Sequence, residues 1–110
     1  MKLYTTDDDL RTAHLIAHKG RARNIELPRV LVKHMGAYYV FPATGGYGRS
    51  GVPDIIGCYK GKFFGIECKA GKNKPTALQE KNLTDISSAE GISVVVNEDN
   101  MHEVTKILQC

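Results

Sequence analysis

The segment VPDIIGCYKGKFFGIECK, residues 52–69, decides the fold of this 110-residue chain. Its two runs of apolar, aromatic and β-branched residues, 52–59 and 62–69, predict two strands. The pair Lys60-Gly61 between them predicts a tight turn, so the two strands are expected to form an antiparallel hairpin. Charged side chains interrupt both runs near the ends that lie far from the turn. The hairpin is therefore the first place to look for a functional site.

Upstream of the hairpin, the chain predicts two helices and one more strand. The spacing of apolar residues indicates a helix over 7–18. A second helix is expected within 24–35, where Pro28 is tolerated only in the first turn and Gly36 ends the helix. Residues 37–41, AYYVF, are aromatic and β-branched and predict a strand.

Downstream of the hairpin, a helix is predicted over 76–89. Its apolar side is expected to include Leu78, Leu83 and Ile86. The continuous apolar run at 92–96 predicts a buried strand, and 99–109 predicts a closing helix. The element order is α-α-β-β-β-α-β-α. This order predicts a mixed α/β fold with a sheet of about four strands flanked by helices.

Length and composition indicate one globular domain over residues 1–110, in which 1–23 form a helical extension and a basic link, KGRAR. Apolar residues make up 42% and charged residues 25%, and no apolar run approaches the roughly 20 residues of a membrane span. The net charge of +3 is compatible with a nucleic-acid partner without demonstrating one. The three cysteines form no Cys-x-x-Cys pair and no signal peptide is recognised, so reduced thiols and a cytoplasmic location are expected.

The glycine-rich stretch GGYGRSG, residues 45–51, contains Gly46-x-Gly48-x-x-Gly51, the spacing of a dinucleotide-binding fingerprint. Such a fingerprint needs a helix to begin at its end, because the helix N-terminus holds the pyrophosphate. The sequence after Gly51 predicts a strand instead, so no nucleotide cofactor is expected. The glycines are interpreted as allowing the backbone to turn tightly onto the strand that carries Asp54.

Asp54 on the first strand of the hairpin, and Glu67 and Lys69 on the second, form the candidate site. Side chains two residues apart share a strand face, and counting from the turn sets Asp54 nearly opposite Glu67. Two close carboxylates require a cation between them, and oxygen ligands favour Mg²⁺ or Mn²⁺. With a lysine on the same face, the set suits metal-dependent phosphodiester hydrolysis. An Asp–Lys–Glu ion-pair cluster on a solvated sheet face explains the same spacing, so the residues alone leave both interpretations open.

Three blocks of the sequence resemble the virus-type replication-repair nuclease (VRR-NUC) family of the PD-(D/E)xK superfamily. They are GRSGVPDIIG at 48–57, KFFGIECK at 62–69 and PTALQ at 75–79. The resemblance covers most of the chain. It implies a PD-(D/E)xK nuclease-like fold and a small stand-alone nuclease of the phage and bacterial type, often dimeric. Larger relatives carry the domain in DNA-repair enzymes that act on branched structures.

The resemblance also implies roles for individual residues. Asp54 and Glu67 match the metal-binding acids of the family. Cys68 would contribute its backbone carbonyl, with its side chain directed to the core. Lys69 matches the catalytic lysine, and Gln79 matches a glutamine that lies close to the metal site.

Further residues complete the expected site. The family carries a glutamate near the metals in its first core helix, and Glu26 is the candidate here. Arg49 in the glycine-rich stretch, and Lys72 and Lys74 after the hairpin, are expected to contact phosphates, although solvated surface charges would have the same pattern. The sequence thus predicts a homodimeric, Mg²⁺- or Mn²⁺-dependent DNA endonuclease, selective for branched, flap or junction DNA in replication, repair or recombination. The alternative is a non-catalytic nucleic-acid-binding module on the same fold.

Overall fold

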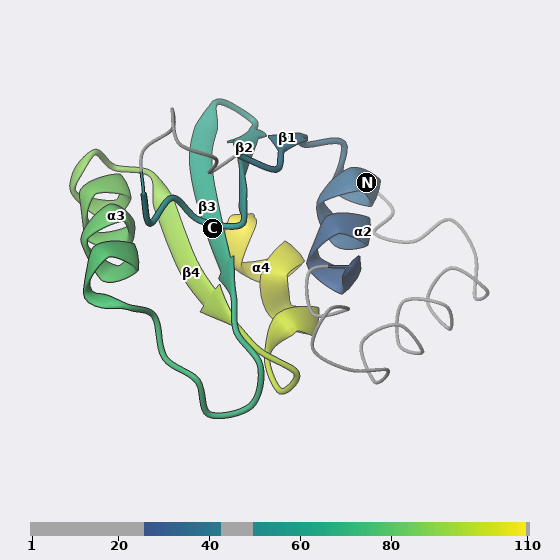
Figure 1. Cartoon of the computed structure of the whole chain (residues 1–110). Coiled ribbons are helices and arrows are strands. Elements are labelled where there is room, and N and C mark those ends of the chain that lie inside the picture. The colour runs from purple at the N-terminus through teal and green to yellow at the C-terminus, as the bar shows by residue number, and fades with distance from the viewer. Residues whose placement is uncertain (1–25, 43–49, 110) are drawn as a thin grey trace.

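The computed structural model describes residues 26–42 and 50–109 (Figure 1). The helix predicted over 7–18 and the basic link at 19–23 lie outside these residues. The described elements, in chain order, are α2 (Glu26–Met35), β1 (Tyr38–Val40), β2 (Ile55–Tyr59), β3 (Lys62–Cys68), α3 (Ala77–Ser88), β4 (Ile92–Val96), the 3₁₀ turn η2 (Met101–Glu103) and α4 (Val104–Leu108). Over the described residues this is the predicted order.

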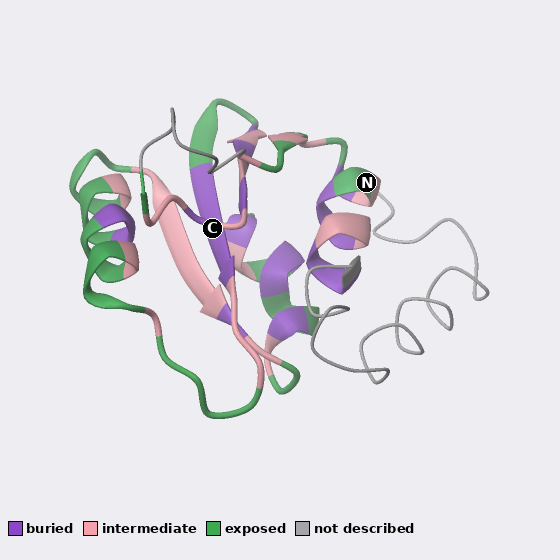
Figure 2. Ribbon diagram, viewed as in Figure 1, coloured by how far each residue is buried: buried purple, intermediate pink, exposed green. Residues whose placement is uncertain are grey.

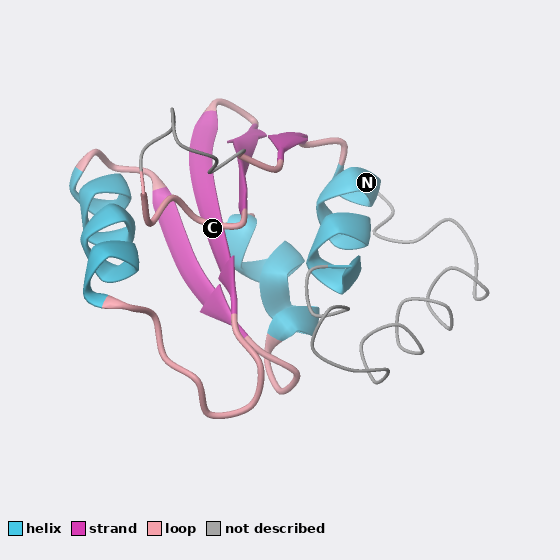
Figure 3. Ribbon diagram, in the orientation of Figure 1, coloured by secondary structure: helices cyan, strands magenta, loops and turns pink. Residues whose placement is uncertain are grey.

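The four strands of the described residues form one sheet in the order β1-β2-β3-β4 (Figure 3). The β1–β2 and β2–β3 pairs are antiparallel, and β4 lies parallel to β3. The predicted hairpin is confirmed, because Lys60 and Gly61 have φ angles of 50° and 83°, as a two-residue type I′ turn requires. The register pairs Ile55 with Ile66. Asp54 and Glu67 are the next residues away from the turn, so Asp54 comes opposite Glu67.

Helices cover both faces of the sheet (Figures 1 and 3). α2 and α4 pack against each other on one face, and α3 packs on the other face beside β3 and β4. Figure 2 shows buried residues along β2 and β3 and in α2 and α4. The buried core comprises Leu27, Leu31, Val32, Met35, Ile55, Tyr59, Phe64, Ile66, Val96, Met101, Val104 and Leu108. The described residues thus form the predicted mixed α/β fold, with three α-helices around a four-strand sheet.

α2 lies where the sequence predicted the second helix. It begins at Glu26, which places Pro28 in the first turn, where no backbone N–H is needed. Gly36 follows its last residue with a φ of 82°, the left-handed conformation that ends many helices. No helix in residues 26–42 and 50–109 has the length and apolarity needed to cross a membrane.

The strand predicted over 52–59 is shorter than expected. β2 begins only at Ile55, and Asp54 stands at a bend before it. Pro53 has no N–H to donate to a strand ladder, and the Asp54 side chain makes a backbone contact of its own, described below. Asp54 therefore lies at the entrance of the strand and not within it.

Two elements on the C-terminal side also differ from the prediction. β4 was expected to be buried, but only Val96 is buried and the other residues are half-buried, because β4 is an edge of the sheet. Within α3, Leu78 was expected on the apolar side but is 48% exposed, and the polar Asn82 is buried instead. The helix predicted over 99–109 consists of η2 followed by the short α4.

Candidate active site

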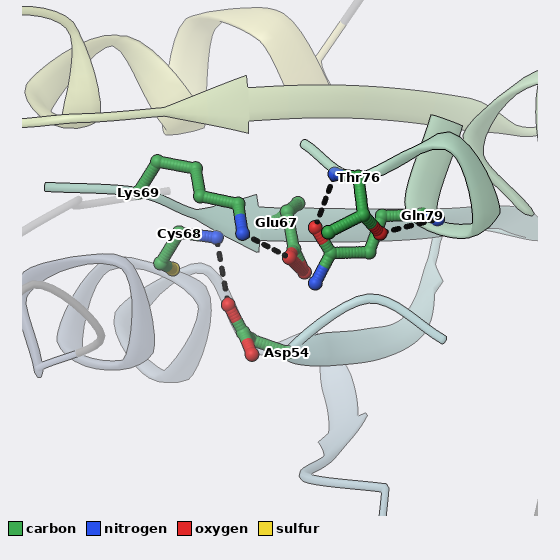
Figure 4. Close-up of polar contacts among 6 residues, drawn as sticks. All are labelled: Asp54, Glu67, Cys68, Lys69, Thr76 and Gln79. Atoms are coloured by element: carbon green, nitrogen blue, oxygen red, sulfur yellow. Dashed lines mark hydrogen bonds and ion pairs between the residues drawn. The ribbon is translucent and has the colours of Figure 1, made fainter. Parts of the chain in front are cut away.

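The candidate site forms where β2 begins and β3 ends. The Lys69 N–H donates to the Val96 carbonyl oxygen at 2.9 Å, on the β4 side of β3. Successive N–H groups of a strand point to opposite sides, so the Cys68 N–H points toward β2. It donates there to Asp54 Oδ2 at 2.8 Å (Figure 4). This bond holds the Asp54 carboxylate beside the end of β3.

Glu67 is the buried member of the acidic pair. Its side chain is 2% exposed, and Oε1 has no hydrogen-bond partner among the described residues. Oε2 lies 3.6 Å from Lys69 Nζ, which confirms that Glu67 and Lys69 share one face of the strand (Figure 4). Buried carboxylate oxygens are usually paired. The unpaired Oε1 therefore indicates a place for a cation or for a hydrogen-bond donor.

The electrostatics of the pair favour a bound cation. Burial and the neighbouring Asp54 carboxylate raise the pKa of Glu67 from 4.5 to about 7, and the Lys69 ammonium opposes part of this rise. A divalent cation would offset the charge of both carboxylates. Burial also raises the pKa of the Cys68 thiol, which packs partly buried against the core as predicted. Burial thus makes this thiol harder to ionise, which disfavours it as a nucleophile.

The start of α3 packs against the segment that leads into Asp54. Gly51 has a φ of 81°, and a Cβ there would lie 2.8 Å from the Leu78 carbonyl carbon and oxygen, so the close approach requires glycine. Asn82 Nδ2 donates to the carbonyl oxygens of Ser50 and Leu78, at 3.1 and 2.9 Å. These contacts fix the entrance of β2 relative to α3.

Thr76 and Gln79 form a capping box at the N-terminus of α3. The Gln79 N–H donates to Thr76 Oγ1 at 3.2 Å, and the Thr76 N–H donates to Gln79 Oε1 at 2.9 Å. Figure 4 shows the side chain of Gln79 directed from the helix toward Glu67. The structure thus brings together Asp54, Glu67, Lys69 and Gln79 at one place.

Not every predicted site residue is placed by the structure. Glu26 begins α2, but its side chain lies outside the described part of the chain. Arg49, with Gly46 and Gly48, also lies outside the described residues, so these predictions stay predictions.

Lys72 and Lys74 are exposed in the loop between β3 and α3. In the same loop the Gly71 N–H donates to both carboxylate oxygens of Glu98, at 3.1 and 2.9 Å. Glu98 therefore anchors the loop beside the C-terminal end of β4. The two lysines lie on a loop that continues directly from Lys69.

The acidic pair fits a divalent metal ion. A buried carboxylate oxygen without a partner, next to a second carboxylate, is a suitable set of hard oxygen donors for Mg²⁺ or Mn²⁺. Within residues 26–42 and 50–109 no three His, Cys, Asp or Glu side chains form a metal-binding group. Mg²⁺ often takes only one or two protein carboxylates and keeps water or phosphate oxygens as its other ligands. Two carboxylates are therefore enough side chains for a candidate Mg²⁺ site.

Two residues that shape this site, Thr76 and Asn82, were not expected from the sequence. Thr76 and Gln79 are spaced as Thr-x-x-Gln, which is itself the signature of a capping box and was available in the sequence. The signal for Asn82 was weaker. It is a polar residue four positions after Leu78, on the side of the helix that was expected to be apolar. Only the structure shows that its amide binds two backbone carbonyls.

Comparison with known families agrees with this geometry. Residues 16–101 match the family described as archaeal Holliday junction resolvase (hjc). No curated protein matches the chain. The family match supports the superfamily that the sequence resemblance indicated, without distinguishing the VRR-NUC group within it. The chain belongs to the archaeal Holliday junction resolvase family, a family of metal-dependent nucleases of the PD-(D/E)xK type.

Proposed function

We propose that this protein is a Mg²⁺- or Mn²⁺-dependent endonuclease that cuts branched DNA, with the four-way junction as its main substrate. The observation that carries the proposal is the buried Glu67 carboxylate, with one unpaired oxygen, beside Asp54 and Lys69. The name of the matching family supports the junction as the substrate. A surface ion-pair cluster, the alternative that the sequence left open, would not bury a carboxylate oxygen without a partner.

In the proposed reaction Asp54, Glu67 and the Cys68 carbonyl would hold the metal ion. When bound, such an ion activates water and offsets charge on the phosphate. Lys69 Nζ, 3.6 Å from Glu67 Oε2, would orient the attacking water or stabilise the charge that develops on the phosphate. Because Glu67 is shielded from solvent, these charge interactions are stronger than they would be in water.

The loop that carries Lys72 and Lys74 is the proposed contact with the DNA backbone. Both side chains are exposed and follow Lys69 along the chain, so they extend the positive charge away from the site. Lysines bind phosphates without reading bases. This is consistent with recognition of DNA shape and not of sequence. We keep Arg49 as a further phosphate contact and Glu26 as a further acid of the site.

The test is cleavage of labelled DNA: a four-way junction, a flap, a splayed arm, a duplex and a single strand, each with Mg²⁺, Mn²⁺ or EDTA. We expect metal-dependent incision that is fastest on the four-way junction. Faster cutting of flaps or splayed arms would favour the VRR-NUC-like repair role over junction resolution. Binding of the junction without incision under either metal would contradict the nuclease proposal and support a non-catalytic DNA-binding module.

We also propose that the active form is a homodimer. A four-way junction has two-fold symmetry and is resolved by two related cuts, which a two-fold symmetric dimer would make with its two sites. Exposed apolar side chains on one sheet face, Tyr38, Val40 and Phe63, are of the kind that subunit contacts bury. Light scattering should give twice the 12.1 kDa mass of one chain. A monomeric mass at the concentrations that support cleavage would contradict the dimer.

A further inference from the structure

The paired part of the sheet ends one residue before Asp54 is reached. The last pair between β2 and β3 on this side is Ile55 with Ile66. The Asp54 carboxylate is held at its far end by the Cys68 N–H, at 2.8 Å from Oδ2 (Figure 4). On the N-terminal side, the position of Asp54 therefore depends on what holds residues 50–53.

One buried side chain of α3 holds the start of this segment. Asn82 is 6% exposed, and its Nδ2 donates to the carbonyl oxygens of Ser50 and Leu78, at 3.1 and 2.9 Å. A carbonyl oxygen only accepts, so both bonds come from the NH₂ group of the amide. The bond to Ser50 joins residues 32 positions apart in the chain. Asn82 thus links α3 directly to the segment that leads to Asp54.

The segment between Ser50 and Asp54 is stiff. Gly51 has a φ of 81° and packs so closely on α3 that a Cβ would lie 2.8 Å from a backbone carbonyl of the helix. Pro53 is buried, its ring fixes its own φ, and it restricts the residue before it. The ring lies against β3, where a Cβ on Gly65 would be 3.0 Å from Pro53 Cγ. A displacement of Ser50 is therefore passed on to Asp54.

We propose that Asn82 is a positioning residue for the metal site, because by anchoring Ser50 to α3 it sets the place of the Asp54 carboxylate beside Glu67. Asn82 acts through the backbone of the segment and not by binding the metal ion itself. Losing an outer contact that orients a metal ligand commonly weakens metal binding or activity by about 10–100-fold. The expected effect on metal binding rests on the proposed function, whereas the effect on Asp54 can be measured without metal.

The metal-free test is amide hydrogen exchange in EDTA, followed by NMR, for the wild type, Asn82→Ala and Leu83→Ala. Two adjacent amides report different contacts, because the Cys68 N–H donates to Asp54 and the Lys69 N–H donates to β4. We expect Cys68 in Asn82→Ala to exchange about 10-fold faster than in the wild type, relative to Lys69. Leu83→Ala truncates the neighbouring buried residue of α3 and should affect both amides equally. Equal changes in Asn82→Ala would overturn the proposal, because Asn82 would then only stabilise the fold.

A second variant, Gly51→Ala, disturbs the same contact from the other side and keeps the Asn82 amide. The added Cβ would lie 2.8 Å from the Leu78 carbonyl and 2.9 Å from Asn82 Nδ2, so the segment must shift away from α3. We expect the same selective loss of protection at the Cys68 amide. Unchanged protection of Cys68 would overturn the proposal, because a displacement of the segment would then not reach Asp54.

Calorimetry with Mn²⁺ relates this positioning to the metal site. Asn82→Ala should bind Mn²⁺ about 10–100-fold more weakly than the wild type, and Leu83→Ala should bind it like the wild type at temperatures where both are folded. Unchanged Mn²⁺ affinity in Asn82→Ala would overturn the role of this residue in the metal site.

The two proposals can fail separately. If the wild type binds no Mn²⁺ and cuts no DNA, the proposed function fails, while a selective change at the Cys68 amide still shows that Asn82 positions Asp54. If the wild type cuts junctions but the Cys68 and Lys69 amides respond alike in Asn82→Ala, the function stands and the positioning role fails.

Discussion

The Asp54→Asn variant is expected to fold normally and to lose junction cleavage by at least about 10³-fold. Asparagine keeps a side-chain oxygen that accepts the Cys68 N–H, which Asp54 Oδ2 accepts at 2.8 Å in the wild type. It removes the negative charge that the metal ion needs beside Glu67. The melting temperature without metal should therefore stay close to that of the wild type, while Mn²⁺ binding and cleavage are lost.

Two further variants serve as the comparison and the control for Asp54→Asn. Asp54→Ala also removes the acceptor of the Cys68 N–H, and leaving this donor without a partner costs about 1–3 kcal/mol, so this variant should be less stable than Asp54→Asn. Asp85→Asn removes a carboxylate from an exposed face of α3, where it pairs with Lys81 at 2.9 Å, and should cleave like the wild type. A folded Asp54→Asn protein that cuts junctions at the wild-type rate would exclude Asp54 as an essential metal ligand.

The hairpin could be predicted because its information is local. The Lys60-Gly61 pair specifies the turn, and the alternation of side chains along each strand then fixes the register. The first residue of β2 could not be predicted in the same way. β2 begins only after Asp54, whose side chain accepts a hydrogen bond from the Cys68 N–H at the end of β3. The exposure of β4 depends on its position at the sheet edge, which no local pattern reveals.

The site was predictable to the extent that it lies on the hairpin. Asp54, Glu67 and Lys69 follow from strand periodicity, whereas Gln79 came from the family resemblance and not from a pattern of spacing. The burial of Glu67 was not predictable, because it depends on α3 packing over the end of β3. The orientation of the Gln79 amide depends on a capping bond, and the sequence shows only that such a bond is possible.

Replacing Glu67 by glutamine is expected to abolish cleavage while making the metal-free protein more stable at pH 8. In the wild type the fold raises the pKa of Glu67 from 4.5 to about 7, mainly by burial. The folded state thus holds the proton more tightly than the unfolded state does. The contribution of Glu67 to stability is most favourable below pH 4.5, and it declines as the pH rises to about 7. The whole decline amounts to about 3 kcal/mol.

Urea unfolding of Glu67→Gln and wild type in EDTA, from pH 4 to pH 8, measures this effect. Because glutamine stays neutral, the stability difference in favour of the variant should grow by about 3 kcal/mol across this range. Mg²⁺ or Mn²⁺ at pH 8 should reduce the difference, since only the wild type gains stability from the bound cation. Glu90→Gln, at an exposed position after α3, is the matched control and should show no such growth. A difference that is constant with pH would mean that the fold does not place a buried charge at Glu67, and the metal site proposed from that charge would lose its main support.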